Sequence, residues 1–127
     1  MKIFIPKDTS AVALDADDVA QALSRAQHAL EAEICRNGSR GAFWLEPLVE
    51  VELAAGRYAF GPIGVEDVPE LLECLPGRLE DHPKYLGLTE DIPWLANQER
   101  VTFARAGLGD PICIHTYTNL SGFSGLE

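Results

Sequence analysis

The spacing of apolar residues changes early in the chain, in an order that few folds accommodate. Residues 2–6 are mostly apolar and Pro6 stops the run, which predicts a buried first strand. From Asp15 the spacing becomes helical, with Asp15 as candidate N-cap and Asp17 and Asp18 in a first turn that favours negative charge. The apolar stripe of this helix consists of Val19, Leu23, Ala26 and Leu30.

The next short strand candidate is 33–36, and a glycine-bearing loop follows it at 37–41. A segment of alternating apolar and acidic residues comes after this loop. Residues 49–53 place apolar side chains between Glu50 and Glu52. This period of two is typical of a strand with one face in the core and one in water. We therefore expect both glutamates on the wet face.

The partner of this strand is expected at 57–61, after a turn in which Gly56 takes the left-handed position. Helical spacing returns over 65–75, where Pro69 is tolerable because the N–H groups of a first turn have no acceptor within the helix. Strand, helix, strand, hairpin and helix make up the order of a thioredoxin-like α/β fold, a mixed sheet of about four strands with flanking helices.

The rest of the chain is expected to form a C-terminal extension over 79–127, outside a domain at 1–78. Residues 78–91 are polar and interrupted by proline and glycine, which favours a linker, and 92–106 could form one more helix. Several apolar residues of the extension would be costly to leave bare: Ile92, Trp94, Leu95, Val101 and Phe103. We expect the extension to fold back on the domain or to drive self-association into a homo-oligomer.

Twenty acidic residues against ten basic ones give a formal charge of −10. Phosphate backbones and anionic membrane surfaces would be repelled, so nucleic acid is not an expected partner. We otherwise attribute the net negative charge to a role in keeping the protein soluble. No apolar run approaches the length of a membrane span or of a secretory h-region, so we expect no membrane insertion and a cytoplasmic protein.

Residue types that carry catalysis or bind metals are scattered along the chain. Cys35, Cys74 and Cys113 form no CxxC pair and are interpreted as free thiols. The three histidines lack a neighbouring cysteine or carboxylate pattern, and no serine lies in a GxSxG context. We predict no catalytic residue, no cofactor-binding residue and no metal ligand in this chain.

Two stretches resemble the flavin-bearing subunits of NAD-linked oxidoreductases. Residues 36–51, Arg-Asn-Gly-Ser-Arg-Gly-Ala-Phe-Trp-Leu-Glu-Pro-Leu-Val-Glu-Val, are similar to a run in the beta (diaphorase) subunit of NAD-dependent formate dehydrogenase. Residues 87–101 and their continuation to Leu126 resemble the segment that leads into the flavin-binding core of that subunit. The related subunits of bidirectional hydrogenases and of respiratory complex I share the resemblance.

The resemblance implies that 1–78 is the thioredoxin-like domain of such a subunit and 79–127 its linker with the incomplete start of the flavin-binding core. The parent complex passes electrons from formate through a molybdenum (alpha) subunit and iron–sulfur centres, including those of a gamma subunit, to FMN and then NAD⁺. FMN, NAD and Fe–S clusters are thus implied for the parent subunit or complex, with none in this chain.

In the cluster-bearing relatives, four cysteines in two loops hold a [2Fe–2S] centre. The resemblance puts Pro6 and Ala11 near the first pair and Ser39 and Phe43 on the second, so no cluster is expected because iron requires thiolates there. We also expect Phe43, with Trp44, to pack into the vacated space. This interpretation requires a buried Phe43.

One loop gathers positive charge and glycine in an acidic chain, and it is the candidate interface. Its residues are Arg36, Asn37, Gly38, Ser39, Arg40 and Gly41, with Trp44 just beyond. Three interpretations stay open: a structural turn whose arginines pair with local acids, a subunit or interdomain contact, and a nest for a small anion.

The expected function is a non-catalytic assembly or docking domain of a formate dehydrogenase beta subunit, from a gene product that could be longer than this chain. The alternative is a small thioredoxin-like electron carrier, or a ferredoxin-type domain, with a metal or thiol centre of its own. Iron–thiolate absorption would distinguish the two.

Overall fold

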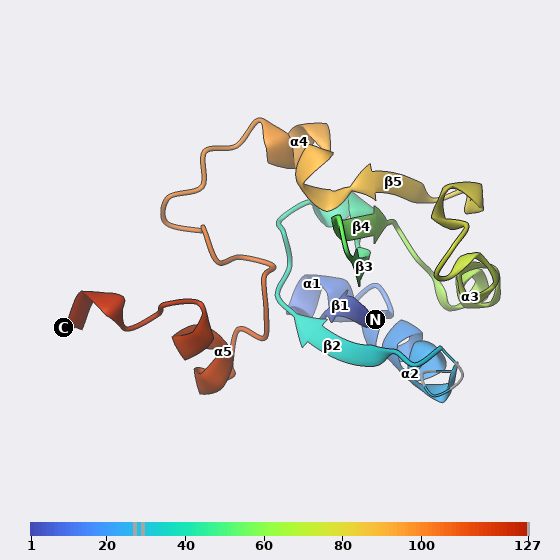
Figure 1. Cartoon of the computed structure of the whole chain (residues 1–127), viewed down its shortest axis with the longest axis horizontal. Coiled ribbons are helices and arrows are strands. Elements are labelled where there is room, and N and C mark those ends of the chain that lie inside the picture. The colour runs from blue at the N-terminus through green and yellow to red at the C-terminus, as the bar shows by residue number, and fades with distance from the viewer. Residues whose placement is uncertain (27, 29, 127) are drawn as a thin grey trace.

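A computed structural model describes residues 1–26, 28 and 30–126 and places a five-stranded sheet at the centre (Figure 1). The strands are β1 (Lys2–Pro6), β2 (Glu33–Asn37), β3 (Val49–Leu53), β4 (Gly56–Phe60) and β5 (Tyr85–Leu88). The α-helices are α1 (Thr9–Val12), α2 (Ala16–Ala26), α3 (Val68–Cys74), α4 (Pro93–Ala96) and α5 (Ile114–Asn119). Single 3₁₀ turns are η1 (Phe43–Leu45), η2 (Val65–Asp67), η3 (Leu79–Asp81), η4 (Thr89–Asp91) and η5 (Ser124–Leu126).

The strand order is β2-β1-β3-β4-β5, with β1 and β2 parallel and the remaining neighbours antiparallel. The mixed sheet with flanking helices confirms the predicted α/β class, and the first four strands have the order and directions of a thioredoxin-like fold. The fifth strand is a correction. Residues 85–88 were expected in a linker, yet they pair with β4, with an irregular register between Ala59 and Phe60.

The main core lies between one face of the sheet and the helices α2 and α3, which pack against each other. Alternate residues of β1 and β3 point into it, as their period of two predicts. The largest fully buried side chains of this core are Ile3, Ile5, Val19, Leu23, Val49, Val51, Phe60, Ile63 and Leu71. Each such aliphatic or aromatic side chain contributes about 1.5–3 kcal/mol by leaving water.

Helix α2 begins where the sequence indicates. Asp15 precedes its first residue with a φ of 67°, and Asp17 and Asp18 occupy the first turn. The helix ends at Ala26, earlier than the predicted stripe, whose last member Leu30 lies in a turn and still packs against the core. Residues 27 and 29 of that stretch lie outside the described part.

The opposite face of the sheet corrects the prediction for β3. Glu50, expected in water, is 1% exposed, whereas Glu52 is partly exposed. A buried carboxylate is stable only when it is paired and hydrogen-bonded. Glu50 has such a partner in Arg40, and irregular chain from residues 97–110, here called the strap, lies over this face.

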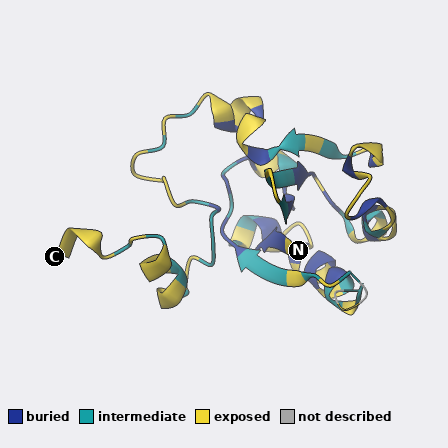
Figure 2. Cartoon of the chain, in the orientation of Figure 1, coloured by how far each residue is buried: buried dark blue, intermediate teal, exposed yellow. Residues whose placement is uncertain are grey.

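The extension departs from the predicted helix over 92–106. Only α4 is helical there, and Ile92 and Leu95 are buried in a second, smaller cluster with Leu48 and Ala59. The strap then runs on without regular structure to the arm, residues 111–126, which carries α5 (Figure 2). The expected folding back buries Ile92 and Leu95 and attaches the strap through polar contacts, whereas Trp94, Val101, Phe103 and most of the arm stay exposed. No helix in the described part of the chain is long and apolar enough to span a membrane.

Candidate functional site

The predicted interface residues divide between the end of β2 and the loop after it. Arg36 lies within β2, where its guanidinium donates to the Asp17 carboxylate at 2.7 Å and to the carbonyl of Pro6 at 2.9 Å. Asn37 closes the strand and is buried. Arg36 therefore ties the strand to α2 and to the end of β1, with its guanidinium turned away from the loop.

Arg40 is the central residue of the loop. Its Nε and Nη2 donate to the two carboxylate oxygens of Glu50 at 2.9 and 2.8 Å, and Nη1 donates to Glu90 at 2.8 Å. Burial of the guanidinium acts to lower the pKa of Arg40, but the hydrogen bonds and charges of Glu50 and Glu90 outweigh it and raise that pKa above its ordinary value. Arg40 is therefore a permanent, paired cation.

Backbone N–H groups of the loop donate hydrogen bonds to acceptors within the chain. The N–H of Ser39 donates to the Asp8 carboxylate, that of Gly41 to the Ser39 hydroxyl at 2.9 Å, and that of Gly38 to the carbonyl of Gly109 at 3.1 Å. Because Arg40 of the loop and Arg36 of β2 are paired to carboxylates as well, the interpretation of a structural turn accounts for these contacts.

A buried carboxyl supports the loop from below. Glu46 accepts a hydrogen bond from the Ser39 hydroxyl at 2.6 Å and another from the N–H of Leu48 at 3.1 Å. Burial raises the pKa of Glu46, an effect that these two bonds oppose without cancelling.

The prediction that Phe43 fills a vacated cluster space is wrong. Phe43 is 60% exposed and Trp44 57%, because η1 turns both side chains outward while Ala42 faces the interior. Trp44 instead meets Trp94 of α4 edge to face, with ring centroids 5.1 Å apart. Phe43, Trp44 and Trp94 are called the aromatic surface below.

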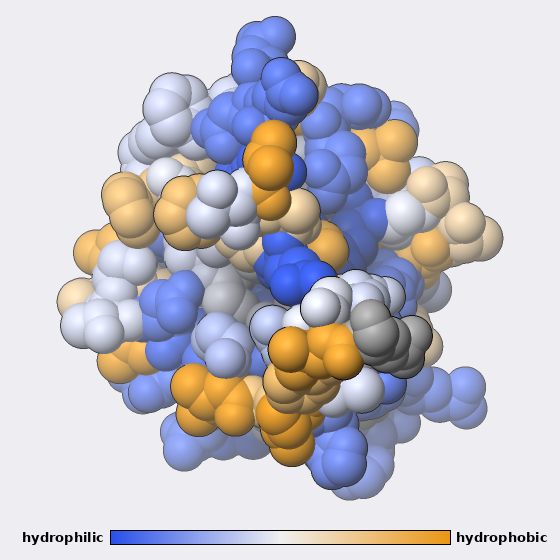
Figure 3. All heavy atoms as spheres, turned by 90° about the vertical axis from the view of Figure 1, so that its left-hand side faces the viewer, coloured by the Kyte–Doolittle hydropathy of each residue, from blue (hydrophilic) through white to orange (hydrophobic). Residues whose placement is uncertain are grey.

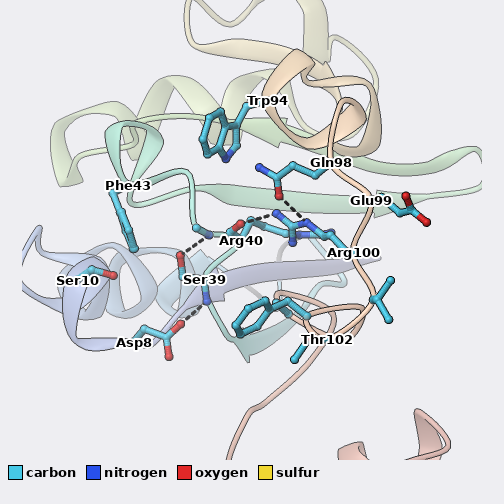
Figure 4. A pocket seen from close by; sticks show the side chains of 14 residues that line it. Asp8, Ser10, Ser39, Arg40, Phe43, Trp94, Gln98, Glu99, Arg100 and Thr102 are labelled. Atoms are coloured by element: carbon cyan, nitrogen blue, oxygen red, sulfur yellow. Dashed lines mark hydrogen bonds between the residues drawn. The ribbon is translucent and has the colours of Figure 1, made fainter.

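An open cavity of about 780 Å³ lies beside this surface, between the loop and the strap. Phe43 and Trp94 stand at its rim, with Arg40 and Arg100 deeper inside (Figure 4). Asp8, Ser10 of α1 and Ser39 of the loop after β2 line the opposite side. The sequence marked Trp94 only as costly to expose, and nothing in it indicated a cavity.

Polar contacts hold the strap to the sheet face. Asn37 Nδ2 donates to the carbonyl of Gly107 at 2.9 Å, and Arg57 donates to the carbonyls of Gly107 and Leu108 at 3.2 and 2.8 Å. Arg100 returns a bond to the carbonyl of Arg40 at 2.7 Å.

The far end of the strap is fixed by an ion pair. Lys7 Nζ lies 2.8 Å from Asp110, and this bond holds the pKa of Asp110 below its ordinary value. Asn37 and Arg40, predicted as interface residues, thus make an interface within the chain.

The remaining reactive side chains stand apart from this region. The three cysteines are free, as predicted. Burial raises the pKa of Cys35, while hydrogen bonds from Thr116 lower the pKa of Cys113. His82 is buried edge-on against Phe60. Among the residues that the structure describes, no three His, Cys, Asp or Glu side chains are grouped to hold a metal ion.

The loop attaches the strap to the sheet by contacts within the chain. The aromatic surface beside it is exposed and apolar, as binding surfaces commonly are. No protein-family model and no curated protein sequence matches the chain.

Proposed function

We propose that this chain is a non-catalytic assembly domain of an NAD-linked formate dehydrogenase beta subunit. In the parent complex, electrons pass from formate through molybdenum and Fe–S centres to FMN and NAD⁺. The proposal starts from the resemblance of 36–51 and 87–101 to that subunit and is supported by the thioredoxin-like order of the sheet.

One observation carries the proposal. The two resembling stretches meet in space, because Arg40 and Asn37 of the first bind Arg100 and Gly107 of the second and of its continuation. The loop that holds a cluster in the cofactor-bearing relatives here fastens the polypeptide that leads toward the flavin-binding core. A domain built in this way sets the position of the polypeptide that continues from it.

The arm provides the surface for docking. Its apolar side chains gather on one side of the molecule (Figure 3). The strongly exposed ones are Ile112, Ile114, Phe123 and Leu126. Exposed apolar side chains that gather on one face are typical of interaction sites. We propose that the flavin-binding core covers the arm, that the gamma and alpha subunits complete the assembly, and that the isolated chain uses the same surface for self-association.

Binding to a flavin-binding core tests the proposal. The core is an FMN-loaded formate dehydrogenase beta subunit from which the region corresponding to this chain has been removed. We expect the two to co-elute one to one in gel filtration. The double variant Ile112→Ser/Leu126→Ser should abolish co-elution, whereas Leu14→Ser, an exposed apolar residue outside the arm, should not. Failure of the wild-type chain to bind would overturn the proposal.

An absorption spectrum tests the electron-carrier alternative. The chain is reconstituted anaerobically with iron and sulfide and compared with untreated protein. The assembly proposal expects equal spectra, since Pro6, Ala11, Ser39 and Phe43 stand where the relatives have cysteines. Thiolate-to-iron bands that survive desalting would favour the carrier.

A further inference from the structure

Two tryptophans that lie 50 residues apart in sequence form one exposed platform. Trp44 of η1 and Trp94 of α4 are in edge-to-face contact at an interplanar angle of 83°, yet they remain 57% and 50% exposed. Phe43 continues the platform to the cavity rim. Trp and Phe carry more apolar area than other residues, so leaving three of them together in water forgoes stabilisation that a partner would recover.

The platform is fixed from beneath. Leu45, which neighbours Trp44, and Leu95, which neighbours Trp94, pack in the smaller core cluster. Its fully or nearly fully buried members are Leu48, Ala59, Ile92 and Leu95. Because η1 and α4 are both anchored in this cluster, the indoles are ordered before any partner arrives. Binding hot spots are enriched in tryptophan, and side chains that are already positioned cost less to immobilise on binding.

The charge around the platform is acidic. Glu90 and Asp91 lie in η4 directly before α4, and Glu99 lines the adjoining cavity; all three are exposed. The nearby guanidinium groups are already engaged, Arg40 by Glu50 and Glu90 and Arg100 by Gln98 and a backbone carbonyl. Because Glu90 is already bound by Arg40, a partner meets the aromatic faces and the carboxylates of Asp91 and Glu99.

We propose that the aromatic surface binds a positively charged, arginine-bearing segment of a partner protein. A guanidinium plane stacks on an indole face and donates two parallel hydrogen bonds to a carboxylate at the same time, whereas an ammonium group makes a cation–π contact without planar stacking or bidentate geometry. The cavity beside Phe43 and Trp94 offers room for an apolar side chain next to the arginine. This inference rests on the proposed docking function and assigns a second surface, separate from the arm.

Tryptophan fluorescence tests the inference directly, because the chain has two tryptophans and both belong to the surface. The full chain is titrated at low salt with an acetylated peptide of four Arg-Leu repeats. We expect a saturable change in emission, binding at least about tenfold weaker for the Lys-Leu peptide, and no binding of the Glu-Leu peptide. Binding should weaken as salt rises.

Variants separate a specific site from general attraction to an acidic protein. Calorimetry measures the affinity for the Arg-Leu peptide. We expect it to fall about tenfold or more in Trp94→Ala and in the pair Asp91→Asn/Glu99→Gln. The charge-matched pair Asp18→Asn/Glu70→Gln, on exposed positions of α2 and α3, and Phe123→Ala of the arm should not lower it. Circular dichroism confirms that each variant is folded.

No saturable change with the Arg-Leu peptide, or equal affinity in Trp94→Ala, would overturn the inference. The two proposals fail separately. If the chain binds the flavin-binding core but not the peptide, the docking function holds without this surface. If the chain binds the peptide but does not co-elute with the flavin-binding core, the site for a basic segment is supported and only the proposed parent complex is refuted.

Discussion

Arg40 binds both carboxylate oxygens of Glu50 from a loop ten residues earlier in the chain, and both side chains are buried. Removing one member leaves the other buried charge with a weaker partner, Arg57 at 3.5 Å for Glu50 or the exposed Glu90 for Arg40. Breaking a buried pair costs about 3–5 kcal/mol, here toward the lower end, whereas an apolar pair of similar volume is often tolerated. We predict that Arg40→Met or Glu50→Leu alone lowers the free energy of unfolding by about that amount, and that the double variant loses less than half as much. Urea denaturation measures all three.

Glu52→Ala is the matched control, because this glutamate of the same strand face is partly exposed and makes only a long contact, 3.6 Å, with Arg57. It should change the free energy of unfolding by less than about 1 kcal/mol. Additive losses in the double variant would contradict a coupled Arg40–Glu50 pair.

Gly107 is predicted to be irreplaceable in the strap. Its φ is 79°, and a Cβ at this position would collide with Cδ of Arg40. We expect Gly107→Ala to destabilise the protein by about 1–3 kcal/mol and to speed tryptic cleavage at Arg100, whose guanidinium is otherwise held by the carbonyl of Arg40. Gly77→Ala, where a Cβ meets open space, is the control; equal cleavage rates in the two variants would refute the prediction.

Glu46 gives the stability a pH dependence of known sign. Its pKa is raised above 4.5 by burial, so the folded protein binds this proton more tightly than the unfolded chain does. The resulting stabilisation is complete below about pH 4.5 and is lost as the pH rises through the folded pKa. We expect Glu46→Gln to gain stability relative to wild type between pH 4.5 and 7.5, measured by urea denaturation at each pH.

Ser39→Ala should extend this window to higher pH. It removes a hydrogen bond that lowers the pKa of Glu46 in the folded protein, so the loss of stability should still begin near pH 4.5 but continue to a higher pH than in wild type. A gain for Glu46→Gln that does not vary with pH would contradict the assignment.

Leu95 is predicted to hold α4 in place. It is buried in the smaller cluster, and truncation of a buried leucine costs about 2–5 kcal/mol. We expect Leu95→Ala to cost about 2 kcal/mol or more and to shift the tryptophan emission to the red, since Trp94 loses its support against Trp44. Leu86→Ala, a more exposed leucine of β5, should do neither.

The regular part of the fold could be predicted because burial there follows local periodicity. Apolar residues spaced by two, or by three to four, were enough to predict the first four strands and the helices α2 and α3. Strand β5 gave no such signal, since its four residues include Gly87 with a φ of 86° and only one neighbour, β4, orders it.

The candidate site depended on contacts that a one-dimensional pattern does not contain. Glu50 matches a wet-face residue in every local respect, and its burial depends on Arg40, folded over it, and on Arg57 at 3.5 Å. The helix expected over 92–106 stops after Ala96. Beyond it the strap follows the polar groups of Asn37 and Arg57 on the sheet face. Phe43 was assigned from the resemblance, which carries no information about the direction of its side chain.

The side chains that hold the strap reach its main-chain carbonyls at Gly107 and Leu108. Such contacts depend on the path of the main chain and not on most of the side chains that it carries. Residue 108 could therefore change freely in evolution while the attachment persisted, and selection would act on Asn37, Arg57 and Gly107, together with the side-chain contacts of Arg100 and Asp110. A comparison that scores identity along the strap would overlook the attachment even in proteins that retain it.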